Sequence, residues 1–86
     1  MAFFCVMMYT VYVLFSDTHN KHYTGYTSNL MQRLLSHNEL GEDWTKSYRP
    51  WRVTYNAEFS LKAEAMQQER WLKTGAGKDF INSLKH

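Results

Sequence analysis

The pattern of apolar and polar residues along the chain predicts three strands. Residues 8–15 are apolar and rich in Val and Tyr, which is typical of a central strand. A polar turn over residues 16–21 separates them from the β-prone residues 22–27, so we expect an antiparallel hairpin. After Pro50, every second residue of 51–59 is apolar, and this alternation predicts a strand with one buried face and one polar face.

The segment after the hairpin predicts a first helix. Thr27 or Ser28 is a candidate cap for a helix that runs to about residue 38. Spacing of 100° per residue gathers four apolar residues in one arc: Leu30, Met31, Leu34 and Leu35. Arg33 and His37 lie together beside this arc, one turn apart.

A second helix is predicted over residues 61 to about 74, with Ser60 as its cap and Gly75 and Gly77 at its end. Its apolar arc is formed by Leu61, Ala65, Met66 and Leu72. Glu69 falls in the middle of this arc. A carboxylate on the buried stripe of a helix costs on the order of several kcal/mol unless a cation, a donor or a metal meets it. Glu69 is therefore the strongest anomaly in the pattern.

A short third helix over residues 78–84 completes the order β-β-α-β-α-α. This order predicts an α/β fold of the α+β type, in which a small three-stranded antiparallel sheet is flanked by helices. A chain of 86 residues has material for one core, so we expect residues 8–86 to form one domain and residues 1–7 to be an N-terminal extension or arm. The apolar share of 44% and aromatic share of 16% exclude a disordered chain.

Composition also indicates the cellular compartment of the protein. The single cysteine, Cys5, excludes an internal disulfide framework and suits a reducing compartment. No stretch is long enough to span a bilayer, and the apolar start lacks the basic leader of a signal peptide. We therefore expect a cytoplasmic protein. The net charge of +2 is too small to argue for nucleic acid by itself, although residues 46–52 mix cations with aromatic rings.

Five side chains that could carry chemistry occur in a distinctive order: Tyr12, Tyr23, Arg33, His37 and Glu69. Each has an ordinary structural explanation, such as strand packing, a solvated helix edge or a salt bridge. In combination, Thr10-Val-Tyr12, Tyr23-Thr-Gly25, Arg33 with His37, and Glu69 before Arg-Trp resemble the motifs of the GIY-YIG nuclease family. The resemblance covers residues 8–81 and is strongest to small stand-alone bacterial members, which are related to the nuclease domain of the excision-repair endonuclease. The first motif lacks its glycine, and Asn82 is only a loose counterpart of the family's downstream Asn.

The resemblance implies a metal-dependent endonuclease that hydrolyses phosphodiester bonds. DNA is favoured over RNA as substrate, and repair or recombination as the setting. Glu69 would anchor one Mg²⁺ or Mn²⁺ ion, and Arg33 would contact phosphate oxygens. Tyr12 would be the base or would orient water, with Tyr23 as its hydrogen-bonded companion. His37 would shuttle a proton or contact phosphate. A tyrosine base needs a nearby cation to lower its pKa.

Further residues are expected to contact nucleic acid: Gly25, Tyr26, Lys46, Arg49 and Arg52. Two interpretations of the basic aromatic segment over residues 46–52 are equally open. The segment contacts a nucleic-acid backbone and stacks on a base, or it is a solvated turn with Trp51 in the core. A monomer is favoured over an oligomer. We expect little intrinsic sequence specificity, because a catalytic module of this size leaves no room for a separate reading domain, and a protein partner is a candidate source of specificity.

Two other functions remain open from the sequence. A nucleic-acid-binding module with little or no turnover is favoured by the missing glycine of the first motif. A structural or protein-interaction domain would instead use the two tyrosines and Glu69 as an internal hydrogen-bond network.

Overall fold

The computed structural model describes residues 8–40 and 44–84, so the expected N-terminal arm at residues 1–7 lies outside the described part of the chain. Three strands form one antiparallel sheet: β1 (Tyr9–Ser16), β2 (Lys21–Thr27) and β3 (Trp51–Phe59). The strand order is β2-β1-β3, which places β1 in the centre, as its continuous apolar sequence predicts. The hairpin of β1 and β2 is confirmed, with Tyr12 opposite Gly25.

Helical segments connect and cover the strands. They are α1 (Leu30–Leu35), the π-helical turn η1 (Ser36–Leu40), the 3-10 turn η2 (Trp44–Tyr48), α2 (Lys62–Leu72) and α3 (Gly75–Asn82). The predicted order β-β-α-β-α-α and the α+β class are confirmed. None of the helices in the described ranges combines the length and the apolar character that a bilayer span needs.

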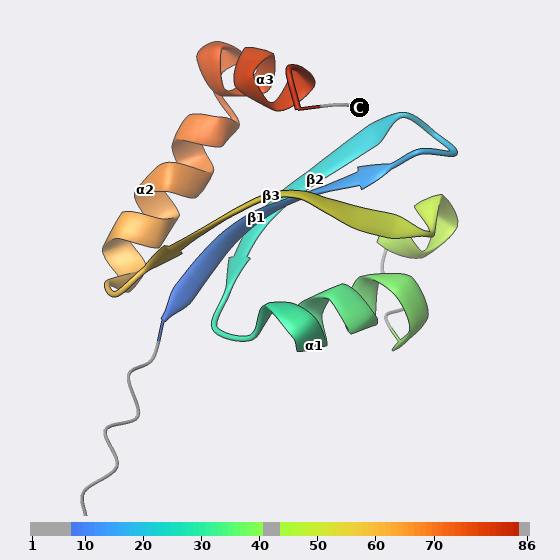
Figure 1. Cartoon of the computed structure of the whole chain (residues 1–86), viewed down its shortest axis with the longest axis horizontal. Helices are drawn as coiled ribbons and strands as arrows, with labels where there is room; N and C mark the ends of the chain where they lie inside the picture. The colour runs from blue at the N-terminus through green and yellow to red at the C-terminus, as the bar shows by residue number, and fades with distance from the viewer. Residues whose placement is uncertain (1–7, 41–43, 85–86) are drawn as a thin grey trace, which may run out of the picture.

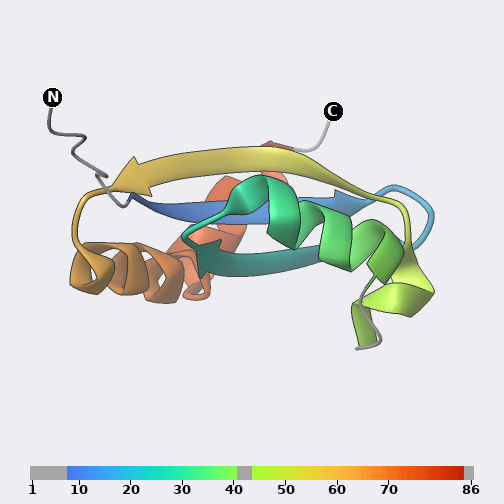
Figure 2. The ribbon, with the colours of Figure 1, turned by 90° about the horizontal axis from the view of Figure 1, so that it is seen from below.

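The helices divide between the two faces of the sheet. α1 lies on one face, and α2 and α3 cover the other (Figures 1 and 2). Successive residues of β1 point to opposite faces. Val11 and Val13 therefore pack with Ala65 of α2, whereas Tyr12 and Leu14 form a second cluster against which α1 packs. We call these sides the α2 face and the α1 face.

The alternation in β3 did not predict its faces correctly. Val13 pairs with Tyr55 but Leu14 pairs with Val53, so Thr54 is an extra residue in the ladder, a β-bulge. An extra residue shifts the two-residue period by one and moves the following side chains to the other face. Trp51 and Val53 consequently pack on the α1 face, and the apolar residues beyond the bulge on the α2 face, instead of all sharing one buried face.

The start of α1 also differs from the prediction. Asn29, and not Thr27 or Ser28, caps the helix, since its side chain accepts a hydrogen bond from the backbone N–H of Gln32. Only half of the predicted arc packs on the sheet. Leu30 and Leu34 contact the α1-face cluster, whereas Met31 is 76% exposed and Leu35 is 43% exposed.

The second predicted helix is shorter than expected. Its cap residue is Leu61, which makes no side-chain capping bond, so the prediction of Ser60 was wrong. Ala65 and Leu72 are buried as predicted, but Leu61 and Met66 are exposed. A short helix contacts the sheet with one narrow stripe, and the outer residues of a wide arc remain in solvent.

The third helix begins earlier than predicted. Thr74 caps α3 by accepting from the N–H of Gly77, so Gly75 and Gly77 lie inside α3 and do not simply end α2. A Cβ added to Gly77 would lie 2.5 Å from the Cα of Leu72. This close approach lets α3 fold back against the end of α2, and it requires glycine.

Candidate active site

Four of the five predicted catalytic side chains meet on the α1 face. Tyr12 comes from β1, Tyr23 from β2, Arg33 from α1 and His37 from η1. Strand pairing places the two tyrosine rings in a stacked arrangement, with 6.1 Å between their centroids. The His37 ring lies 4.5 Å from the Tyr23 ring, centroid to centroid. Residues that are up to 25 positions apart in sequence thus form one cluster, which we call the tyrosine–arginine–histidine cluster.

Arg33 joins the two tyrosines. Its Nε donates to the hydroxyl of Tyr12 and its Nη2 to the hydroxyl of Tyr23, each at 3.4 Å. The guanidinium fork therefore contacts both phenol oxygens at once, which a lysine ammonium does not reproduce. Arg33 remains partly exposed, so its remaining donors face a region that solvent reaches.

His37 lies behind Tyr12 and is almost fully buried, with 1% exposure. Its Nε2 is 3.4 Å from the Tyr12 hydroxyl, and its Nδ1 is 3.0 Å from Oγ1 of Thr45. The Tyr12 oxygen accepts from Arg33, and its own proton can be donated to Nε2 of His37 when that nitrogen carries no proton. A neutral imidazole that accepts at Nε2 carries its proton at Nδ1 and donates it to Thr45. The contacts therefore support a hydrogen-bonded chain from Tyr12 through His37 to Thr45.

Burial of Tyr12 sets its protonation. The Tyr12 side chain is 1% exposed, and this burial raises the pKa of its hydroxyl above the ordinary value of 10.0, against the lowering effect of the hydrogen bond from Arg33. A tyrosine base was expected to have its pKa lowered by a nearby cation, but here desolvation outweighs the cation. Tyr12 is therefore a neutral hydroxyl at physiological pH.

The raised pKa of Tyr12 predicts a loss of stability at alkaline pH. The folded state disfavours the phenolate. The contribution of Tyr12 to the free energy of unfolding is therefore constant at pH values below the unfolded-state pKa of about 10, and it falls as the pH rises through the folded-state pKa. Urea unfolding of the wild type and Tyr12→Phe across this pH range measures the effect. We expect the free energy of unfolding of the wild type to decline more steeply at alkaline pH. Parallel profiles for the two proteins would contradict a raised pKa of Tyr12.

Gly25 makes room for the tyrosines. It lies opposite Tyr12 in the β1–β2 ladder, and a Cβ at this position would be 2.8 Å from the Tyr12 hydroxyl and 3.1 Å from Cε1 of Tyr23. Such distances are shorter than van der Waals contact. A side chain at position 25 would therefore push against both rings.

Gly25→Ala is expected to destabilise the fold and displace the two tyrosines. Overpacking of a buried site costs about 1–3 kcal/mol, which corresponds to a fall in Tm of roughly 4–24 °C for a domain of this size. Thermal unfolding followed by circular dichroism measures the loss. Gly75→Ala is a matched control because a Cβ there meets nothing within 4 Å. An unchanged Tm for Gly25→Ala would contradict the prediction, because it would show that the two tyrosine rings move aside without a loss of stability.

Glu69 is not joined to this cluster by any contact among the described residues. It lies on α2, which packs on the opposite face of the sheet, and its side chain is 19% exposed. Nζ of Lys73 pairs with its Oε1 at 3.3 Å. Lys73, one helical turn further on, is thus the cation that stabilises this carboxylate on the buried stripe. This is the ordinary salt-bridge explanation that the sequence also allowed.

The described residues contain no group of three or more His, Cys, Asp or Glu side chains that could hold a metal ion. A Mg²⁺ ion keeps most of its waters and is often held by one or two carboxylates. Glu69 fits such a water-rich site as a single ligand, provided that Lys73 releases it.

The predicted nucleic-acid contacts are dispersed. Tyr26 packs against the core of the α2 face, and Arg52 pairs with Asp17 at 2.7 Å on the exposed surface. Arg49 donates to the backbone carbonyls of His37 (2.6 Å) and Ser36 (3.3 Å), so it supports η1 from the side. Lys46 is exposed on η2. Only Gly25 and Arg49 therefore touch residues of the cluster through these contacts.

The support of His37 by η2 was not predicted from the sequence. Thr45 is fully buried and contacts Nδ1 of His37, while its carbonyl accepts from Nε1 of Trp51 at 2.9 Å. Trp51 is 3% exposed, so it enters the core and does not stack on a base. Asn38 exchanges hydrogen bonds with the backbone of Trp51. A threonine outside a regular helix or strand is not identified by hydrophobic periodicity. Only the tertiary packing of η2 against η1 brings Thr45 into contact with His37.

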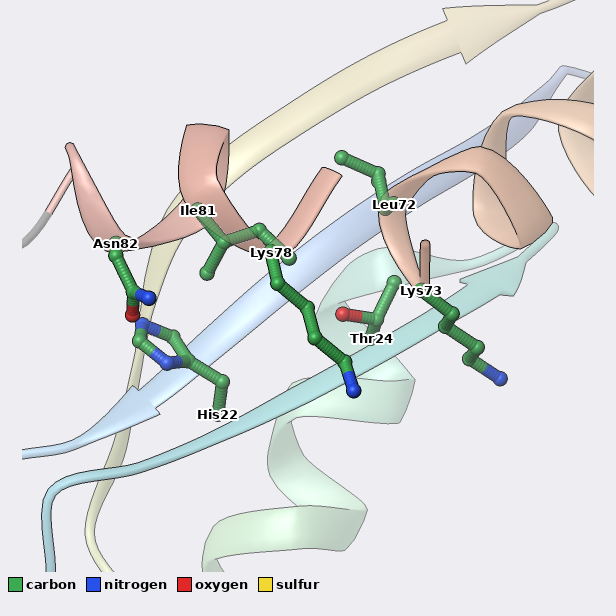
Figure 3. Close-up of a pocket in the computed structure, with 7 residues that line it drawn as sticks. All are labelled: His22, Thr24, Leu72, Lys73, Lys78, Ile81 and Asn82. Carbon is green, nitrogen blue, oxygen red and sulfur yellow. The ribbon is translucent and has the colours of Figure 1, made fainter. Parts of the chain in front are cut away.

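A described cavity lies away from the cluster. It measures about 330 Å³ on the α2 face and is lined by His22, Thr24, Leu72, Lys73, Lys78, Ile81 and Asn82 (Figure 3). Both lysines of its lining, Lys73 and Lys78, are exposed, and Lys73 already pairs with Glu69. The polar groups of the tyrosine–arginine–histidine cluster converge on the α1 face instead. Chemistry, rather than volume, identifies it as the candidate site.

Known proteins with similar sequences identify the family of the chain. Residues 8–81 match the GIY-YIG catalytic domain. The chain is 45% identical over 56 residues to UPF0213 protein SH2523 of Staphylococcus haemolyticus, which covers 64% of this chain and 68% of that one. It is 42% identical over 55 residues to UPF0213 protein YazA of Bacillus subtilis, which covers 63% of this chain and 56% of that one.

The fold is also similar to a solved structure. The solution NMR structure of UPF0213 protein BH0048 from Bacillus halodurans has 32% sequence identity and a TM-score of 0.54, covering 92% of this chain and 86% of that one. The match to the catalytic domain spans both tyrosine strands, α1 and Glu69. The chain therefore belongs to the GIY-YIG family and has its nuclease-like fold.

Proposed function

We propose that the protein hydrolyses phosphodiester bonds of nucleic acid, DNA before RNA, at the tyrosine–arginine–histidine cluster. The observation that carries this proposal is the fork of Arg33 on the hydroxyls of Tyr12 and Tyr23, with His37 hydrogen-bonded behind Tyr12. A partly exposed guanidinium held in place by two hydroxyls suits a phosphate, because its planar donors match phosphate oxygens.

The contacts support a proton relay. As a water oxygen attacks phosphorus, its proton passes to the Tyr12 oxygen while the Tyr12 proton passes to Nε2 of His37. Arg33 stabilises the charge that develops on the phosphate oxygens. The bond to the leaving sugar oxygen breaks, that oxygen takes a proton from solvent, and His37 later releases its extra proton to solvent. This route uses Tyr12 in its neutral form, which agrees with its raised pKa.

Family membership supports dependence on one Mg²⁺ or Mn²⁺ ion, with Glu69 as the residue that would hold it. The ion would supply positive charge to a phosphate. Lys73 competes with a cation for the Glu69 carboxylate, so Lys73→Met is expected to strengthen metal binding.

Cleavage of supercoiled plasmid and branched oligonucleotides by the purified chain tests the proposal. We expect nicking with Mg²⁺ or Mn²⁺ and none with EDTA. Glu69→Gln is expected to abolish the metal-dependent activity, whereas Glu64→Gln, an exposed carboxylate on the same helix, serves as the matched control. Full cleavage by Glu69→Gln would remove Glu69 from the mechanism, and metal-independent cleavage would remove the ion.

A second function is favoured by one observation. Glu69 lies on the opposite face from the cluster and is paired with Lys73, an arrangement that suits binding without turnover. In that case the protein would bind branched or single-stranded nucleic acid, and its affinity would fall steeply with salt because phosphate contacts release counterions. Gel shifts without cleavage would identify this function.

We also propose a monomer that acts in the cytoplasm in repair or recombination, with specificity supplied by a protein partner.

A further inference from the structure

An exposed tryptophan lies beside the candidate site. Trp44, at the start of η2, is 55% exposed, and its ring centroid lies 5.7 Å from that of Tyr23, whose hydroxyl accepts from Arg33. Both rings of this pair are on the α1 face, since Tyr23 belongs to the cluster packed there. An exposed indole beside a residue proposed to bind phosphate suits stacking on a nucleobase.

The position of Trp44 is held by its neighbours. Its ring packs against Tyr48 and Trp51, at centroid distances of 5.6 and 6.2 Å. The next residue, Thr45, is fully buried and contacts His37, which ties η2 to the cluster. One side of the indole is therefore supported by aromatic rings while more than half of its surface remains in solvent. A rigid aromatic surface of this kind loses little conformational entropy when a flat ligand stacks on it.

We propose that Trp44 is the stacking surface for an unpaired base next to the phosphate that Arg33 binds. This inference rests on the proposed function and names its substrate class: nucleic acid with unpaired nucleotides at the site, such as a flap, a branch or a single strand. Bases inside a duplex already stack on both faces and cannot cover the indole, whereas an unpaired base exposes a π-face. Stacking tolerates all four bases, so this surface confers preference for strand structure and not for sequence.

Other exposed aromatics serve as internal controls. Trp71 and Phe80 are 42% and 37% exposed, but they pack against each other, at 6.0 Å between centroids, on the helices of the α2 face. Trp71 therefore offers a tryptophan of similar exposure away from the cluster. Loss of its ring should leave nucleic-acid binding unchanged.

Fluorescence anisotropy in EDTA, where metal-dependent cleavage is absent, tests the proposal. The probes are labelled oligothymidine, an oligomer of abasic nucleotides of equal length, and a blunt duplex. Trp44→Ala is expected to weaken binding of oligothymidine roughly 5- to 100-fold while hardly changing binding of the abasic oligomer or the duplex. Trp44→Phe should retain most of the affinity, and Trp71→Ala should match the wild type. Circular dichroism verifies that each variant is folded.

The outcomes separate this inference from the function on which it rests. If the wild type binds oligothymidine and Trp44→Ala binds it equally well, the stacking role is wrong while the nuclease proposal stands. An equal loss on the abasic oligomer would likewise overturn stacking, because no base is present there. If the wild type binds none of the three probes, the role of Trp44 is wrong, and the cleavage assay with Mg²⁺ or Mn²⁺ decides the proposed function separately.

Discussion

Arg33→Ala is expected to lower the rate of phosphodiester cleavage about 10²- to 10³-fold, the range found when one donor that stabilises transition-state charge is removed. Arg33 is the residue that contacts both tyrosine hydroxyls, and its remaining donors are the cationic groups that the cluster presents. Plasmid nicking and cleavage of labelled branched oligonucleotides measure the rate. The wild type and the variant must be purified identically, so that contaminating nucleases appear equally in both.

Two variants sharpen this measurement. Arg33→Lys keeps the charge but loses the fork, so we expect it to recover only a small part of the rate. Lys62→Ala removes a positive charge at the exposed start of α2, and it is the control for loss of a positive charge. Full cleavage by Arg33→Ala would refute the assignment of the site. Its stability should stay unchanged or rise, because site residues are often not optimised for stability.

Gly77→Ala is expected to destabilise the protein by about 3 kcal/mol, the upper part of the range for overpacked positions. A new Cβ would meet the backbone of Trp71 and Leu72, at 2.5 Å from Cα and 2.6 Å from the carbonyl carbon of Leu72. Backbone atoms cannot rotate away as a side chain can, so α3 would have to move off the end of α2. The expected fall in Tm is roughly 12–24 °C for a domain of this size.

Gly75→Ala distinguishes crowding from a general effect of replacing glycine. Position 75 lies in the first turn of the same helix, and a Cβ there meets nothing within 4 Å. Alanine at this position should stabilise the fold by about 0.4–1 kcal/mol by reducing the freedom of the unfolded chain. Equal melting temperatures for the two variants would show that α3 does not depend on the close approach at Gly77.

The consequence for function depends on which face is affected. Gly77 and Ile81 belong to α3, which packs on the α2 face, whereas Tyr12 and Arg33 lie on the α1 face. Gly77→Ala should therefore lower the temperature at which activity is lost more than the rate of the protein that remains folded. Arg33→Ala should do the reverse. This contrast separates the stability of the sheet from the chemistry of the cluster.

Local patterns predicted most of the architecture. The continuous apolar run of β1, the hairpin with β2 and the alternation in β3 depend on neighbouring residues, so their positions can be found without the tertiary structure. The helix boundaries were less accurate. Asn29 caps α1, and Thr74 begins α3 ahead of the predicted position, because caps depend on the backbone geometry of single residues.

The sequence by itself determined the order of the elements, the α+β class and the identity of the motif residues, because periodicity and motif spacing are properties of the chain. Only the tertiary structure decided which of these residues meet. The bulge at Thr54 turned Tyr55 away from Trp51, and the return of η2 placed Thr45 under His37 and Trp44 beside Tyr23. Packing of α2 on the opposite face left Glu69 with Lys73. Apart from the Glu69–Lys73 pair, which spans one helical turn, these contacts join separate segments of the chain. Their geometry depends on sheet twist and packing that no local pattern records.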